Sequence, residues 1–76
     1  MKPVTIYTSN GCEYCHEAKE FLDQNNIPYT EHNISKDKEA RTYLMKKGYM
    51  SVPVIIVGDQ EMVGFDRNGL SALLDK

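Results

Sequence analysis

The sequence has few cysteines, no long apolar run and no cluster of basic residues, and each absence excludes a class of protein. Its two cysteines are too few, and too close together, for the disulfide framework of a small secreted domain. No stretch approaches the roughly 20 apolar residues that a membrane span needs. Lysine and arginine are spread along a chain of net charge −2, so we expect neither nucleic acid nor a membrane as a partner.

The start of the chain also lacks the pattern of a secretion signal. The apolar stretch within residues 1–7 is short and interrupted, so we expect a cytoplasmic protein. A chain of 76 residues has room for one compact unit, and we predict a single domain over residues 1–76. In a reducing compartment, a close pair of cysteines is more often catalytic or metal-binding than structural.

The spacing of apolar and turn-forming residues predicts the order β-α-β-α-β-β-α. Strands are expected at residues 3–8, 28–33, 52–57 and 61–65, with a turn at residues 58–60. Helices are expected at residues 12–25 and 36–47, followed by a short last helix after Asp66. Because a strand–helix–strand unit has parallel strands and the last two strands form a hairpin, this order predicts an α/β protein with a four-stranded mixed sheet.

Capping and periodicity give further expectations for the three helices. Ser35 and Asp66 are the expected N-caps of the second and third helices, and Gly48 the expected C-cap of the second. The side chains expected to face inward are Tyr14, Ala18, Phe21 and Leu22, then Ala40, Tyr43, Leu44 and the stem of Lys47, and finally Leu70, Leu73 and Leu74.

Cys12 and Cys15 are the candidate active centre, because they lie where a strand passes into a helix. The first turn of a helix has backbone N–H groups without partners and a partial positive charge, and both favour a thiolate. A free thiol has a pKa of about 8.5, which helix N-termini and Cys-X-X-Cys motifs lower to roughly 3.5–7.5. We therefore expect Cys12 to attack a substrate disulfide and Cys15, one turn deeper, to resolve the mixed disulfide. Glu13 opposes this in part, because a neighbouring acid disfavours the thiolate.

Two metal-based alternatives use the same residues. Cys12-Glu13-Tyr14-Cys15-His16 matches the Cys-X-X-Cys-His haem-attachment motif of an electron carrier, with Met45, Met50 or Met62 as a conceivable distal ligand. The predicted strands and the missing export signal weigh against it. A zinc site would need four ligands, and the candidates are Cys12, Cys15, His16 and His32. Since the paired-histidine half of a zinc motif is absent, we expect no bound metal, and both histidines are expected to be ordinary surface residues.

Pro53 interrupts the most apolar strand, where it cannot donate a ladder hydrogen bond. A cis peptide bond after Val52 would turn the chain and expose the polar groups of Val52 to an extended substrate. A trans proline at the start of a strand explains the residues equally well and is the more ordinary geometry. The residues alone therefore leave both geometries open.

The chain resembles the glutaredoxins over essentially its whole length. The resemblance rests on Tyr7, Gly11-Cys12, Tyr14-Cys15, Ala18-Lys19, Val52-Pro53 and Gly64. It implies a thioredoxin fold, a cis Pro53, and thiol–disulfide oxidoreductase activity that maintains the redox balance of the cell, with no bound cofactor. It also implies a groove for a protein or glutathione disulfide, formed by Cys12, Tyr14, Val52, Pro53, Gly64, Phe65 and Asp66.

Departures from the glutaredoxin pattern concern the electron donor. Glu13 replaces the usual proline, Ser9 replaces the usual lysine, and residues 63–67 only partly match the usual glutathione-binding sequence. Residues 40–49, 53–54 and 64–65 also look like the NrdH-type redoxins, which accept electrons from thioredoxin reductase and reduce ribonucleotide reductase. We therefore expect weak use of glutathione and a flavoprotein reductase as the alternative donor.

The expected protein partners are transient. The net charge and the small apolar rim around Val52 and Phe65 suggest brief contacts between a monomer and its disulfide substrates. A non-catalytic binding module on a redoxin fold is the remaining alternative, because the presence of both cysteines does not establish turnover.

Overall fold

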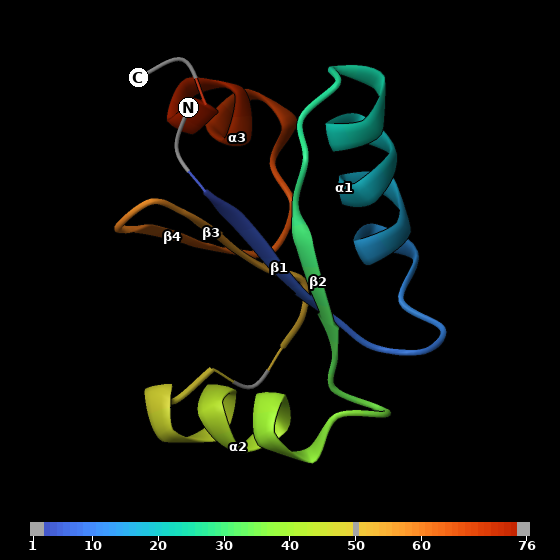
Figure 1. Ribbon diagram of the computed structural model, residues 1–76, viewed down its shortest axis with the longest axis vertical. Coiled ribbons are helices and arrows are strands. Elements are labelled where there is room, and N and C mark those ends of the chain that lie inside the picture. Colours follow the sequence, from blue (N-terminus) through green and yellow to red (C-terminus); the bar gives the residue numbers. More distant parts are fainter. Residues whose placement is uncertain (1–2, 50, 75–76) are drawn as a thin grey trace.

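The computed structural model describes residues 3–49 and 51–74, which form a four-stranded sheet covered by helices on both faces (Figure 1). The strands are β1 (Val4–Thr8), β2 (Thr30–Asn33), β3 (Val54–Val57) and β4 (Gln60–Val63). The helices are α1 (Glu13–Gln24), α2 (Lys38–Lys47) and α3 (Arg67–Leu74). The order is the predicted one, and the architecture is a thioredoxin fold.

The sheet has the strand order β2-β1-β3-β4, with β1 and β2 parallel and the other pairs antiparallel. The parallel first unit, the closing hairpin and the mixed sheet are therefore confirmed. In Figure 1, α1 and α3 lie on one side of the sheet and α2 lies on the other. Helices on both faces explain why the inner strands β1 and β3 are buried on both sides.

Alternation along the strands divides the apolar core into two clusters. Ile6 and Ile55 belong to the cluster that includes Ala18, Leu22 and Leu70, on the side of α1 and α3. Their neighbours along the strands, Tyr7 and Val54, belong to the cluster on the side of α2, together with Ala40 and Leu44. None of the helices in the described part of the chain has the length and apolar character of a membrane-crossing segment.

Several strand boundaries differ from the predicted ones by one or two residues. β2 begins at Thr30 and β3 at Val54, because Pro28 and Pro53 have no N–H to donate to a ladder. The turn in the hairpin is shorter than predicted, since Gln60 already pairs with Val57. β4 ends at Val63 because Gly64 adopts a left-handed φ of 91° and its N–H donates to the Pro53 carbonyl instead (2.7 Å).

The N-cap prediction for α2 was wrong. Asp37, not Ser35, caps this helix, and its Oδ1 accepts hydrogen bonds from the backbone N–H groups of Glu39 (3.0 Å) and Ala40 (3.3 Å). The predicted C-cap is confirmed, since Gly48 has a φ of 82° and ends α2. α3 begins directly after Asp66, whose carbonyl accepts from the Leu70 N–H (2.8 Å).

The inward faces were predicted correctly for the aliphatic residues and wrongly for two aromatic ones. Tyr14 is 65% exposed, and the buried stripe of α1 is Cys15, Ala18 and Leu22. Tyr43 is 38% exposed and stacks on Tyr7 at the margin of its cluster, with ring centroids 5.4 Å apart.

Lys47 is exposed and does not line the inner face of α2 as predicted, and its Nζ pairs with Glu61 of β4 at 3.1 Å. In α3, Leu70 is fully buried, and Leu73 and Leu74 are half-buried against the same core.

Candidate active site

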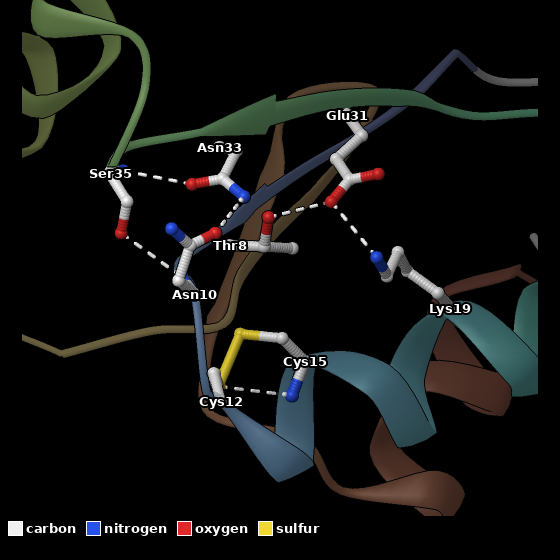
Figure 2. Close-up of polar contacts among 8 residues, drawn as sticks. All are labelled: Thr8, Asn10, Cys12, Cys15, Lys19, Glu31, Asn33 and Ser35. Carbon is white, nitrogen blue, oxygen red and sulfur yellow. Dashed lines mark hydrogen bonds and ion pairs between the residues drawn. A yellow bond between two sulfur atoms is a disulfide. The ribbon is translucent and has the colours of Figure 1, made fainter.

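Cys12 and Cys15 lie at the start of α1, as the sequence predicts, and are joined as a disulfide (Figure 2). Cys12 is the N-cap residue, with extended backbone angles, and its Sγ accepts a hydrogen bond from the Cys15 N–H at 3.1 Å. The Cα atoms are 5.3 Å apart, within the range that a disulfide requires. A helix-terminal N–H that would otherwise be unpaired is therefore directed at the Cys12 sulfur.

The two cysteines differ in their access to solvent. Cys15 is only 2% exposed because it belongs to the inward stripe of α1, whereas Cys12 is partly exposed. A molecule approaching the pair therefore meets the sulfur of Cys12 first. The hollow beside them has a volume of about 740 Å³ and extends along the first turns of α1, where His16 and Glu17 also line it.

Val52, Pro53 and Gly64 are brought to the cysteine pair from distant parts of the chain. The Val52-Pro53 peptide bond is cis, which confirms the geometry that the resemblance to glutaredoxins implied. The Val52 carbonyl oxygen lies 3.9 Å from Cys12 Sγ. Gly64 lies beside Pro53 through the hydrogen bond between their backbone groups. The main-chain groups of this segment therefore border the sulfur that is open to solvent.

The other expected groove residues are arranged less uniformly. Tyr14, two residues after Cys12 in the chain, is exposed, where it can contact a ligand. Phe65 is half-buried and packs its ring against Phe21, with centroids 6.0 Å apart. Asp66 is exposed, and within residues 3–49 and 51–74 no hydrogen bond or ion pair joins it to either cysteine. The structure thus gathers Cys12, Val52, Pro53 and Gly64, and does not join Asp66 to them.

A hydrogen-bonded network holds the loop before Cys12, and the sequence analysis did not find it. The backbone N–H of Asn10 donates to Ser35 Oγ (3.0 Å), and Asn33 Nδ2 donates to Asn10 Oδ1 (3.0 Å), as Figure 2 shows. Asn33 Oδ1 in turn accepts from the Ser35 N–H (2.9 Å). Ser35 therefore fixes the loop that carries Cys12 rather than capping α2. The only feature of the sequence that indicates this role is the position of Ser35 just after the strand that pairs in parallel with β1.

A second unpredicted network lies beside the cysteines and centres on Glu31. The buried Thr8 hydroxyl donates to Glu31 Oε2 (2.7 Å), and Lys19 Nζ donates to the same oxygen (3.0 Å; Figure 2). The hydrogen bond from Thr8 is the main cause that holds the pKa of Glu31 below its ordinary value, with Lys19 acting in the same direction. Glu31 is therefore an ionised carboxylate that ties β2 to α1 and to the end of β1.

The residues of the zinc alternative are not brought together. His16 pairs with Glu20 one turn along α1, and His32 stacks on Tyr7 at a centroid distance of 5.2 Å. In the part of the chain that the structure describes, no group of three or more Cys, His, Asp or Glu side chains could hold a metal ion.

The methionines of the haem alternative are equally scattered. Met62 packs against the α1 and α3 core and Met45 is exposed on α2, whereas Met50 lies outside the described residues.

Comparisons with known proteins give one consistent family. The family model described as Glutaredoxin matches residues 4–62. The glutaredoxin-like protein NrdH of Escherichia coli K12 is 34% identical over 62 residues, covering 82% of this chain and 76% of that protein. The gene 56 protein of Mycobacterium phage D29 is 35% identical over 75 residues, covering 96% and 83%.

A solved structure supports the same assignment. The NrdH-redoxin of Escherichia coli, described as a glutaredoxin-like protein with a thioredoxin-like activity profile, superimposes with a TM-score of 0.86 at 31% identity. The match covers 93% of each chain. The region matched by the family model contains the cysteine pair and the Val52-Pro53 bond, whereas Gly64 and Phe65 lie beyond it.

Proposed function

Because the chain belongs to the glutaredoxin family of thiol–disulfide oxidoreductases, we propose that it reduces protein disulfides by a dithiol mechanism in which Cys12 attacks and Cys15 resolves. The observation that carries this assignment is the asymmetry of the pair. Cys12 is partly exposed and its sulfur accepts a helix-terminal N–H, whereas Cys15 is 2% exposed. The same N–H favours the thiolate of Cys12 in the reduced protein.

The reaction begins with the reduced protein. The Cys12 thiolate attacks one sulfur of the substrate disulfide, forming a new S–S bond while the other substrate sulfur leaves as a thiolate and takes a proton from solvent. Cys15 then loses its proton and attacks Cys12 Sγ, which breaks the mixed disulfide and releases the second substrate thiolate. Two electrons have passed to the substrate, and the protein ends as the Cys12–Cys15 disulfide.

We assign substrate binding to the groups that border Cys12. The carbonyl of Val52 is directed toward the attacking sulfur, and the main chain at Val52 and Pro53 is suited to pairing with an extended substrate. Tyr14 provides an exposed aromatic surface in the first turn of α1, two residues after Cys12. Gly64, Phe65 and Asp66 extend this groove in the proposal, with Asp66 as its outermost residue.

We further propose that a flavoprotein reductase of the thioredoxin-reductase type, and not glutathione, is the main electron donor. Ser9 offers no cation to a glutathione carboxylate, and Glu13 adds a negative charge beside Cys12. The similarity to NrdH proteins points the same way, and it extends the proposal to ribonucleotide reductase as an enzyme that this protein reduces. The cytoplasmic location stays a prediction.

The decisive experiment compares donors on one disulfide substrate. Hydroxyethyl disulfide is reduced by the wild-type protein with either glutathione and glutathione reductase or thioredoxin reductase, and we expect the second system to be faster. A rate with glutathione that equals that of an ordinary glutaredoxin would contradict the assignment of the donor. Thioredoxin reductase without the redoxin provides the background rate.

Two variants test the roles of the cysteines. Cys12→Ser should abolish reduction, because the attacking sulfur is missing. Cys15→Ser should accumulate a mixed disulfide with the substrate, visible by mass spectrometry as an adduct that dithiothreitol removes. Full activity of Cys12→Ser, or an adduct on Cys15 in that variant, would reverse the assigned roles. Complete inactivity of the wild type with both donors would favour a non-catalytic binding module.

A further inference from the structure

Asn10 and Gly11 form the turn directly before Cys12, and the proposed mechanism uses neither residue. An asparagine followed by a glycine occurs at two places in the chain, Asn10-Gly11 and Asn68-Gly69. Asparagine is a chemically labile residue, and it is most labile before glycine, because glycine has no side chain to keep its backbone nitrogen away from the neighbouring amide carbon. The two pairs lie in different kinds of structure, so the fold decides which of them can react.

The reaction is an attack within the chain. The backbone nitrogen of the glycine loses its proton and forms a bond to the side-chain carbonyl carbon of the asparagine, and the amide nitrogen takes up a proton and leaves as ammonia. Water then opens the five-membered succinimide ring at either of its two carbonyl groups. The product is aspartate, or isoaspartate, in which the main chain runs through the side-chain carbon. In both products a carboxylate replaces a neutral amide.

The turn at Asn10 leaves the reacting groups accessible. Asn10 and Gly11 are both exposed, and within residues 3–49 and 51–74 no hydrogen bond engages the Gly11 N–H or Asn10 Nδ2, the leaving group. A methyl group built on Gly11 would meet no atom within 4 Å, so this peptide unit has room to turn. Asn33 Nδ2 donates to Asn10 Oδ1 at 3.0 Å, as Figure 2 shows, and this bond stabilises the negative charge that develops on the oxygen during the attack.

The second pair is held by the helix that contains it. Asn68 and Gly69 lie in the first turn of α3, which the hydrogen bond from the Leu70 N–H to the Asp66 carbonyl closes at 2.8 Å. A methyl group built on Gly69 would lie 2.8 Å from Met62 Cε, so Gly69 is closely packed. Reaction at Asn68 therefore requires the first turn of α3 to open.

Loss of the amide at Asn10 would change the surroundings of Cys12. Both residues line the hollow beside α1, so a carboxylate at residue 10 adds a negative charge near the attacking sulfur and disfavours its thiolate. Isoaspartate also adds one carbon atom to the main chain of a loop that Ser35 and Asn33 hold through hydrogen bonds to Asn10. The longer main chain shifts Cys12 from its place at the start of α1.

We infer that Asn10 is a site of spontaneous deamidation, which the fold selects over Asn68, and that its loss lowers the reactivity of Cys12 as the protein ages. The modification is independent of the proposed function, and only its effect on activity rests on the disulfide-reductase assignment. It needs no enzyme, because water is the only co-reactant.

The test follows both asparagines in the oxidised wild-type protein at mildly alkaline pH, which favours the deprotonated glycine nitrogen. Peptide mapping by mass spectrometry separates aspartate from isoaspartate at residues 10 and 68. In the folded protein we expect Asn10 to react at least about tenfold faster than Asn68, because only Asn68 requires a helix turn to open. In concentrated urea, where both pairs belong to an unfolded chain, the two rates should approach each other.

Three variants separate the charge from the altered main chain. Asn10→Asp has the charge of the product with an ordinary main chain, and at low salt we expect it to reduce hydroxyethyl disulfide about twofold more slowly than the wild type. Asn68→Asp makes the same change in net charge within α3 and should leave this rate unchanged. Wild-type protein aged until isoaspartate has accumulated at residue 10 should be slower than Asn10→Asp, whereas Asn10→Ser, aged equally, should keep its initial rate.

The outcomes distinguish this inference from the proposed function. A ratio of the two deamidation rates that is the same in the folded protein and in urea would overturn the inference, because the sequence alone would then set the reactivity. Faster reaction at Asn68, or an Asn10 that stays intact while the chain in urea deamidates, would also overturn it. Equal rates of disulfide reduction by fresh and aged wild type would overturn the effect on Cys12. Failure of the fresh wild type to reduce hydroxyethyl disulfide would overturn the proposed function, and peptide mapping would still decide the modification.

Discussion

Replacing Thr8 by valine tests the network that joins β1, β2 and α1 behind the active site. Thr8 is 1% exposed, and its hydroxyl donates to Glu31 at 2.7 Å, so valine removes the donor with little change in shape. A hydrogen bond to a charged group contributes roughly 1.5–3 kcal/mol. Because the Glu31 side chain is 32% exposed and keeps its bond to Lys19, we expect a loss of about 1 kcal/mol at neutral pH.

The dependence of this loss on pH identifies its cause. The folded-state pKa of Glu31 lies below its ordinary value, so the stabilisation is fully present above the unfolded-state pKa and disappears as the pH falls through the folded-state pKa. Urea unfolding of the oxidised protein should show a midpoint lowered by about 1 M near pH 7 and by progressively less as the pH falls below the ordinary pKa of a glutamate. Thr5→Val, on the same strand, is the control. An equal loss at neutral and at acidic pH would refute this account of Thr8.

Three further predictions concern single residues. Glu13→Gln should increase the thiolate fraction of the reduced protein at neutral pH, because a negative charge beside Cys12 is removed; an unchanged titration of thiolate absorbance would contradict this. Leu22→Ala should lower the free energy of unfolding by roughly 2–5 kcal/mol, since Leu22 is fully buried, whereas Val63→Ala, at a position 47% exposed, should cost far less. Asp37→Ala should cost about 1 kcal/mol in urea unfolding by removing the cap of α2, and no loss would show that its two hydrogen bonds contribute nothing.

The order of the elements could be predicted because each depends on a local pattern. The run at 54–57 reads as a strand buried on both faces, and Gly48 ends a helix, whatever the rest of the chain does. The choice between Ser35 and Asp37 as N-cap was not local. Both residues can cap a helix, but the Ser35 hydroxyl accepts a hydrogen bond from the backbone N–H of Asn10, 25 residues away in the chain, and Asp37 caps α2 instead.

The candidate site could likewise be predicted where it depends on local patterns, and not where it depends on contacts between distant residues. The cysteine pair is readable from spacing, and the resemblance to glutaredoxins led to the cis Pro53, which the residues alone left open. The network of Thr8, Lys19 and Glu31 could not be predicted from the sequence. It depends on the register of β2 against β1 and on the rotation of α1 about its axis. Tyr14 was misplaced because two neighbouring stripes of α1 have similar apolar content, and Cys15 shows which one faces inward.

The electron donor depends on the charges around the cysteine pair, because the pair itself performs the same exchange with either donor. Glutathione carries more carboxylates than ammonium groups. The hollow beside α1 presents Glu13 and Glu17 to such a ligand, while the cation of Lys19 is already engaged by Glu31. This arrangement favours protein disulfides as substrates and a protein reductase as the donor.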